Sequence, residues 1–219
     1  MRNFEVDLTK YATLVFDCDG VLLDSNKVKT QAFYQAALPY GEKAANALAA
    51  YHIANGGVSR YQKFSYFLEH IVAEPLKELK LEDLLRSYAE HVKSGLINCD
   101  VASGLRDFRK KTQATRWLIV SGGDQEELRE IFSLRHMQDL FDGGIFGSPD
   151  IKETILKREL ANGNLIRPAL FLGDSKYDYK AASEAEIDFV FMSNWTEVSN
   201  WQQWCLDNKI HSLEKISCL

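Results

Sequence analysis

Five short apolar segments constrain the fold more than any other feature of this sequence. Their hydrophobic residues are continuous rather than alternating, which is typical of strands buried on both faces of a parallel sheet. Helical patterns separate the later segments, and strands that alternate with helices predict parallel pairing through right-handed crossovers. The segments are 13–17 (TLVFD), 116–122 (RWLIVSG), 143–148 (GGIFGS), 169–174 (ALFLGD) and 188–193 (DFVFMS).

Two of the intervening segments carry signals of a helix start. Segment 124–135 begins with Asp124 and has Glu127 three residues later, which is the spacing of a capping box. Segment 148–160 has Ser148 as the expected N-cap and Pro149 at the expected first helical position. The tryptophan-rich segment 194–205 is expected to form a helix that packs on the sheet.

The region 26–96 has a different pattern, because amphipathic segments follow one another there and no strand-like run interrupts them. These segments are 41–55, 59–74 and 81–95. We therefore predict an α/β fold with a Rossmann-like parallel-sheet core and a helical cap domain inserted after the first strand. The expected boundaries are 1–25 and 97–219 for the core and 26–96 for the cap.

Composition excludes several classes of function. The 219 residues carry a formal net charge of −5 and the pI is about 5.6, which argues against a nucleic-acid-binding surface. The four cysteines lack metal-site spacing and are expected to be free thiols, and no two histidines have the spacing of metal ligands. The N-terminus does not resemble a secretory signal and no apolar run approaches a membrane span, so we expect a cytoplasmic protein that avoids membranes. Its oligomeric state is unknown from the sequence.

Polar residues follow each of the first four apolar segments. In sheets of this kind, ligands bind outside the carboxyl ends of the strands, so these residues are expected to converge at one edge. In chain order they are Asp17 and Asp19, Ser121 and Gly122, Lys152, and finally Asp174 and Asp178.

The chemistry of this set is coherent. The Ser121 hydroxyl and the amides near Gly122, expected at a helix N-terminus, suit an anion, and Lys152 adds a positive charge. Three aspartates offer the hard oxygen ligands that magnesium prefers, and a divalent cation lets neighbouring carboxylates stay ionised. Taken alone, the Asp-x-Asp-Gly stretch is also typical of a turn. Four such elements in order at four strand ends favour a phosphate and magnesium site.

These elements together resemble the motifs of the haloacid dehalogenase superfamily. The matching residues are DxDGV at 17–21, Ser121, Lys152 and GDxxxD at 173–178. The branch that this sequence resembles contains β-phosphoglucomutase and phosphoglycolate phosphatase. From Asp17 to Ser121 there are 104 positions, which leaves room for that family's cap, whereas the 31 positions from Ser121 to Lys152 are too few for the alternative cap site.

The resemblance implies roles for individual residues. Asp17 would attack phosphorus and form a phosphoaspartyl intermediate, and Asp19 would protonate the leaving group and later deprotonate water. The dehalogenases of the superfamily lack the second aspartate, so Asp19 favours phosphate chemistry. The phosphoryl oxygens would be held by Ser121, Gly122 and Lys152. Magnesium would be bound by Asp17, the backbone carbonyl of Asp19, Asp174 and Asp178, the last as a ligand or as support for the others.

Two departures from the family pattern bear on function. The lysine usually precedes the proline as Ser-Lys-Pro in this branch, whereas Lys152 comes three residues after Pro149. The histidine that the mutases carry after DxDGV aligns with Lys29, which argues against a mutase.

The cap segment 55–64 resembles the substrate loop of β-phosphoglucomutase through Gly-Val-Ser-Arg at 57–60. We expect Arg60 and Lys63 to contact a distal phosphate or acidic group of the substrate. The alternative is that Arg60 is an exposed residue in the first turn of a helix capped by Ser59.

The sequence therefore predicts a magnesium-dependent phosphatase of a small phosphorylated metabolite. A sugar phosphomutase is the first alternative. A non-catalytic binding protein on the same fold is disfavoured by the intact set of aspartates and lysine. A phosphoacceptor receiver domain is disfavoured by the helical insertion and by Asp19.

Overall fold

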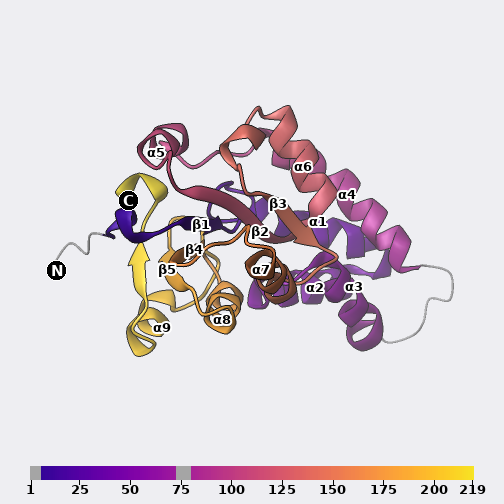
Figure 1. The fold of residues 1–219 in the computed structure, drawn as a ribbon. Helices are drawn as coiled ribbons and strands as arrows, with labels where there is room; N and C mark the ends of the chain where they lie inside the picture. The colour runs from indigo at the N-terminus through magenta and orange to yellow at the C-terminus, as the bar shows by residue number, and fades with distance from the viewer. Residues whose placement is uncertain (1–5, 73–79) are drawn as a thin grey trace.

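A parallel sheet of six strands lies at the centre of the computed structural model, which describes residues 6–72 and 80–219 (Figure 1). The strand order is β3-β2-β1-β4-β5-β6, and each neighbouring pair is parallel. All five predicted strands are confirmed. The short, largely exposed β6 is not predicted, because no apolar run marks it in the sequence. The strands are β1 (Thr13–Phe16), β2 (Arg116–Asp124), β3 (Gly144–Ser148), β4 (Ala169–Gly173), β5 (Asp188–Met192) and β6 (His211–Leu213).

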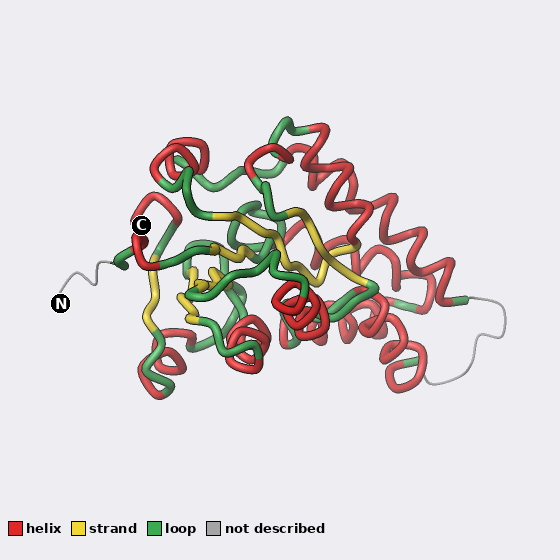
Figure 2. Tube along the Cα trace, in the orientation of Figure 1, coloured by secondary structure: helices red, strands yellow, loops and turns green. Residues whose placement is uncertain are grey.

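Helices surround this sheet, and within the described residues five α-helices lie between β1 and β2 in the sequence. The first four of them gather at one side of the sheet (Figures 1 and 2). They are α1 (Asn26–Ala37), α2 (Glu42–Ala54), α3 (Arg60–Tyr66), which continues as a π-helical turn over Phe67–Ile71, and α4 (Leu81–Asn98). The remaining helices are α5 (Leu105–Lys111), α6 (Gln125–Leu134), α7 (Lys152–Ala161), α8 (Lys176–Glu184) and α9 (Trp201–Asp207). Within the described residues, no helix combines the length and apolar character needed to cross a membrane.

The predicted cap corresponds closely to α1–α4. Helix α1 begins at residue 26, as the expected cap does, and α4 ends at residue 98, two residues beyond the expected boundary. The last two residues of the helix expected over 59–74 lie outside the described part of the chain. The division into core and cap domains at 26 and 96 stays a prediction.

Two connections join these helices to the core, and they pair with each other. The amide of Asp24 donates to the carbonyl of Asp100 at 2.9 Å, and the amide of Ala102 donates to the carbonyl of Leu22 at 2.9 Å. Between them, Leu23 and Val101 form an antiparallel bridge. The chain therefore enters and leaves α1–α4 through one narrow hydrogen-bonded ribbon.

Both faces of the sheet are covered, which explains the continuous apolar runs. On β1, Leu14 and Phe16 belong to the cluster that packs against α5 and α6, whereas Val15 belongs to the cluster that packs against α7 and α8. Figure 1 shows these helix pairs on opposite sides of the strands. Since successive side chains of a strand point to opposite faces, every position in such a strand is buried.

The two predicted helix starts have different outcomes. Asp124 is the N-cap of α6 and accepts the Glu127 amide at 3.0 Å, as predicted. The prediction for the next helix is wrong, because Ser148 remains in β3, where it pairs with Asp124, and α7 begins only at Lys152. Pro149 consequently lies in the connection between them and not in the helix.

Only the end of the tryptophan-rich segment is helical, because α9 begins at Trp201, but this helix packs on the sheet as predicted. The ring of Trp201 stacks on Phe191 of β5 with centroids 5.6 Å apart. Trp204 contacts the same phenylalanine and also meets Tyr179 of α8 edge-on at 5.6 Å. The aromatic rings thus fix α9 beside α8.

Helices α1 and α4 pack closely where Gly95 faces Val28. A methyl group added at Gly95 would lie 2.3 Å from Cγ1 of Val28, so Gly95→Ala should lower the free energy of unfolding by about 1–3 kcal/mol despite the better helix propensity of alanine. Denaturant unfolding measures this change. Val28→Ala in the same chain should restore part of the loss, and purely additive effects of the two substitutions would contradict the contact.

Candidate active site

Three aspartates converge at the carboxyl edge of the sheet. Asp17 directly follows β1, Asp174 directly follows β4, and Asp178 lies in the first turn of α8. All three are buried, and one carboxylate oxygen of each lies within 4.8 Å of the others. Hard oxygen donors at this spacing fit a small divalent cation such as magnesium.

Burial and mutual repulsion disfavour the ionised forms of Asp17 and Asp174. Burial, followed by the charge of Asp178, raises the pKa of Asp17 to about 7. Burial and the charge of Asp17 raise the pKa of Asp174 well above its ordinary value. A cation bound here would stabilise the ionised forms, so the electrostatics of the cluster also fit a metal site.

Lys152 places a positive charge next to this cluster. Its Nζ lies 2.8 Å from Oδ1 of Asp17 and 2.5 Å from Oδ1 of Asp178. Burial alone would lower the pKa of Lys152, but these two carboxylates outweigh burial and raise it. The first residue of α7 therefore reaches the cluster even though it follows the proline.

Asp178 is occupied on both of its oxygens. Oδ1 accepts from Lys152, and Oδ2 accepts from the amide and the hydroxyl of Ser175 at 3.0 and 2.7 Å. This second set of bonds is the capping box of α8. Asp178 thus orients Lys152, and its further role as a metal ligand stays a prediction.

Two residues lie against Asp174, and one of them is the glycine of the DxDGV motif. The amide nitrogen of Asn26 donates to Oδ2 of Asp174 at 2.9 Å and to the carbonyl of Trp195 at 2.8 Å. Gly20 has φ +76°, and a Cβ there would lie 2.1 Å from the same Oδ2. The glycine is required by this close approach. Asn26 escaped the sequence analysis because nothing distinguishes it from an ordinary residue at a helix start.

Asp19 is held apart from the other carboxylates. Ser25 donates its hydroxyl to Oδ1 at 2.5 Å, and Nζ of Lys29 lies 2.5 Å from Oδ2. Burial would raise the pKa of Asp19, but Lys29 and Ser25 outweigh burial and lower it. The carboxylate form of Asp19 is therefore favoured, which suits a base better than an acid.

The predicted phosphate loop is an extension of β2. The strand runs to Asp124 with a register shift after Val120, so Gly122 is three residues before α6 and the expectation of amides at a helix N-terminus is wrong. The hydroxyl of Ser121 is buried and accepts from the amide of Gly123 at 3.0 Å. The extension arises because β3 continues beside it.

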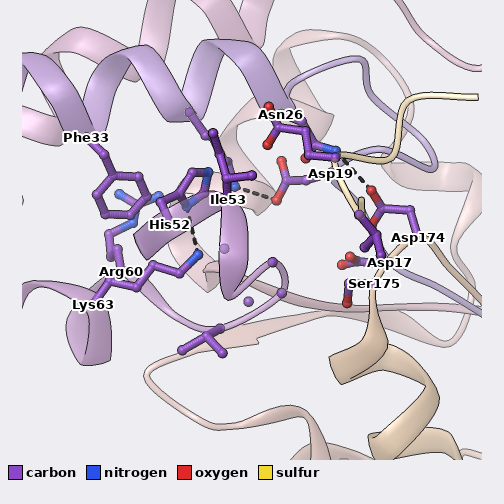
Figure 3. Close-up of a pocket in the computed structure, with 18 of the residues that line it drawn as sticks. Asp17, Asp19, Asn26, Phe33, His52, Ile53, Arg60, Lys63, Asp174 and Ser175 are labelled. Carbon is purple, nitrogen blue, oxygen red and sulfur yellow. Dashed lines mark hydrogen bonds and ion pairs between the residues drawn. The ribbon is translucent and has the colours of Figure 1, made fainter. Parts of the chain in front are cut away.

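A pocket lies between the carboxyl edge of the sheet and helices α1–α4 (Figure 3). Asp17, Asp19 and Asp174 line one end, and His52 and Lys63 line the other. At its wall a cap loop meets a core loop, because a Cβ on Gly122 would lie 2.1 Å from the carbonyl oxygen of Gly57. The glycine of the second motif thus lets these two loops touch.

The two predicted substrate residues lie on this pocket but differ in their partners. Arg60 forms a two-bond ion pair with Glu127 of α6, one bond being 3.0 Å long, and its guanidinium lies 4.4 Å from the ring centre of Tyr88. Ser59 caps α3, as expected, but Arg60 is buried rather than exposed. Substrate contact by Arg60 and Lys63 stays a prediction.

Helix α3 therefore binds the core directly. The hydroxyl of Tyr61 donates to Oδ2 of Asp124 at 2.7 Å, next to the ion pair between Arg60 and Glu127. Lys93 of α4 adds an exposed ion pair to Glu130 at 2.8 Å. Of these contacts, the buried pair is the one most costly to break, because loss of one partner would leave an unpaired charge away from water.

The fold and the site together define a capped α/β protein with a buried aspartate and lysine cluster. Residues 11–186 match the family of haloacid dehalogenase-like hydrolases. The chain belongs to that family, which confirms the resemblance seen in its motifs. No curated protein matches the sequence significantly.

Solved structures share the fold at low identity. A predicted phosphoglycolate phosphatase from Haemophilus somnus is 18% identical over 84% of this chain and 86% of its own, with a TM-score of 0.67. CbbY from Rhodobacter sphaeroides, solved in complex with phosphate, is 16% identical over 95% and 99%, with a TM-score of 0.71. A protein assigned as a β-phosphoglucomutase from Thermotoga maritima is 19% identical over 93% and 94%, with a TM-score of 0.63.

Glu127→Gln tests whether the buried ion pair holds the cap on the core. The variant should lower kcat/KM at least about tenfold for every phosphomonoester it accepts, because cap docking does not depend on the substrate. Glu130→Gln, which alters the exposed pair on the same helix, is the control and should change little. A loss restricted to substrates with a second charged end would instead assign Arg60 to substrate binding.

Proposed function

We propose that the chain is a magnesium-dependent phosphatase of small phosphomonoesters that works through a phosphoaspartyl intermediate on Asp17. The observation that carries this proposal is the position of Lys152, which contacts Asp17 at 2.8 Å beside a buried cluster that fits a divalent cation. Phosphoryl transfer needs little more than positioning and neutralisation of charge, and these residues supply both.

The proposed reaction has two steps. A carboxylate oxygen of Asp17 attacks phosphorus while the bond to the leaving oxygen breaks, and Asp19 donates the proton that the leaving alkoxide takes up. Water then attacks the phosphoaspartate, Asp19 accepts its proton, and inorganic phosphate leaves with Asp17 restored. The lowered pKa of Asp19 supports its second role most directly.

Magnesium would be held by Asp17 and Asp174, with the carbonyl of Asp19 as a further ligand. It would supply positive charge opposite the phosphoryl oxygens. Lys152 would bind the phosphoryl group from the protein side, together with the neighbouring hydroxyl of Ser121 and the amide of Gly122.

A phosphomutase is the second candidate function. The likeness to the Thermotoga maritima protein assigned as a β-phosphoglucomutase and the Gly-Val-Ser-Arg stretch at 57–60 favour it. Lys29 in place of the mutase histidine favours hydrolysis. A mutase would isomerise β-glucose 1-phosphate faster than it released phosphate, and measuring both products decides between the two functions.

We further propose that the protein acts on a phosphorylated metabolite in the cytoplasm. All four cysteines are free, which suits a reducing compartment. The negative net charge supports a small-molecule substrate rather than a nucleic acid.

Asp17→Asn tests the nucleophile. The amide is nearly the same size but cannot form the phosphoaspartyl ester, so phosphate release should fall by at least about three orders of magnitude. A coupled phosphate assay against a panel of phosphorylated metabolites measures this. Turnover like that of the wild type with any member of the panel would refute the assignment.

The metal requirement carries a pH dependence. Phosphate release should stop after treatment with EDTA and return with magnesium. Because the pKa of Asp17 lies at about 7 without a cation, protons compete with magnesium at lower pH. The magnesium concentration for half-maximal activity should therefore rise as the pH falls from 8 to 6, up to about tenfold per pH unit. Full activity in EDTA would contradict the proposal.

A further inference from the structure

We propose that Lys63 and His52 form a binding site for a second anionic group of the substrate, so that the substrate is a phosphomonoester with a carboxylate or a further phosphate at its other end. This inference rests on the proposed function and narrows its substrate class. The two residues line the pocket at the end away from Asp17 and Asp174, and they come from α3 and α2 (Figure 3).

Lys63 is a buried lysine without an acidic partner in contact. Its side chain is almost completely buried, and its Nζ lies 2.8 Å from Nδ1 of His52, which is its only direct hydrogen-bond partner among residues 6–72 and 80–219. A lysine buried in this way normally pairs with a carboxylate, because an isolated charge is costly to remove from water. An ammonium with one partner retains two further N–H donors for an anion.

The other charges around the pocket do not fill this role. Lys29 is paired with Asp19, and Arg60 is paired with Glu127. Glu197 lies on the pocket wall, and its charge acts to raise the pKa of Lys63, but it forms no ion pair with the lysine. Its hydrogen bond is with the hydroxyl of Thr30 at 3.4 Å. One positive group at this end of the pocket is therefore left for a ligand.

His52 extends the same site. When Lys63 is charged, its ammonium donates to Nδ1 of His52 and the ring then carries its proton on Nε2. This nitrogen has no hydrogen-bond partner within the described residues. The ring packs on Phe33 with centroids 4.5 Å apart, which fixes its orientation. One ammonium and one imidazole N–H beside an aromatic wall suit an oxyanion.

The titration of the pair agrees with this assignment. Burial, followed by the charge of Lys29, lowers the pKa of Lys63 to about 7, and burial and Lys63 lower the pKa of His52 well below its ordinary value. An anion bound beside the pair would offset both effects and favour the charged lysine. Strongly shifted groups on the wall of a pocket are characteristic of functional sites.

Matched substrates of the wild-type protein test the inference directly. Three series of alkyl phosphates of increasing chain length, ending in a carboxylate, a second phosphate or a hydroxyl, are assayed with magnesium. At the best chain length, kcat/KM should be at least about tenfold higher for a charged end than for the hydroxyl end. The better of the two charged series identifies the anionic group.

The variants assign this preference to the residues. Lys63→Met should reduce the preference for the charged end to about twofold or less, and His52→Gln should reduce it in the same direction. Lys43→Met changes an exposed lysine of α2 and should keep the preference of the wild type. Thermal unfolding by circular dichroism verifies that each variant is folded.

Two results would overturn the inference. Equal kcat/KM of the wild type for charged and hydroxyl ends, with clear turnover of both, would overturn it while the phosphatase function stood. A preference that survives in folded Lys63→Met would also overturn it. Absence of turnover for every phosphate ester, p-nitrophenyl phosphate included, would instead refute the proposed function and this inference with it.

Discussion

The contact of Lys152 with Asp17 and Asp178 is the interaction on which the site depends. Three buried carboxylates at the end of a sheet repel one another, and the buried ammonium is the charge within the protein that offsets this repulsion. Its position in turn depends on α7, which begins at that residue, and on the capping box of α8, which holds Asp178. The positions at which α7 and α8 begin thus set the geometry of the charged cluster.

The cap is joined to this centre by charge as well as by packing. Lys29 binds Asp19 from α1, and Arg60 binds Glu127 from α3, so each of two cap helices places a buried cation against a carboxylate of the core. The approach of Gly57 to Gly122 brings the loops into contact. The residues proposed to bind substrate and those proposed to react therefore line one pocket.

Much of this arrangement could be predicted from the sequence, because local patterns carried it. Continuous apolar runs identified five strands, and their ends identified the aspartates and Lys152. Partners set by tertiary contacts were missed: Glu127 has the spacing of a capping box, yet its side chain binds Arg60. Ser148 looks like an N-cap but lies at the end of β3 and pairs with Asp124 of β2. Asn26 and His52 carry no pattern of their own, and only the folded chain shows what they contact.

The ribbon that joins the cap to the core has a mechanical consequence. Because its two segments are hydrogen-bonded to each other through Leu22–Ala102 and Asp24–Asp100, any tilt of α1–α4 against the sheet would have to bend both segments together. Lys29 lies in α1, on the cap side of this ribbon, and Asp19 lies after β1, on the core side. A tilt of this kind would lengthen the ion pair between Lys29 and Asp19, so the proton affinity of Asp19 would depend on the angle between the two parts of the chain.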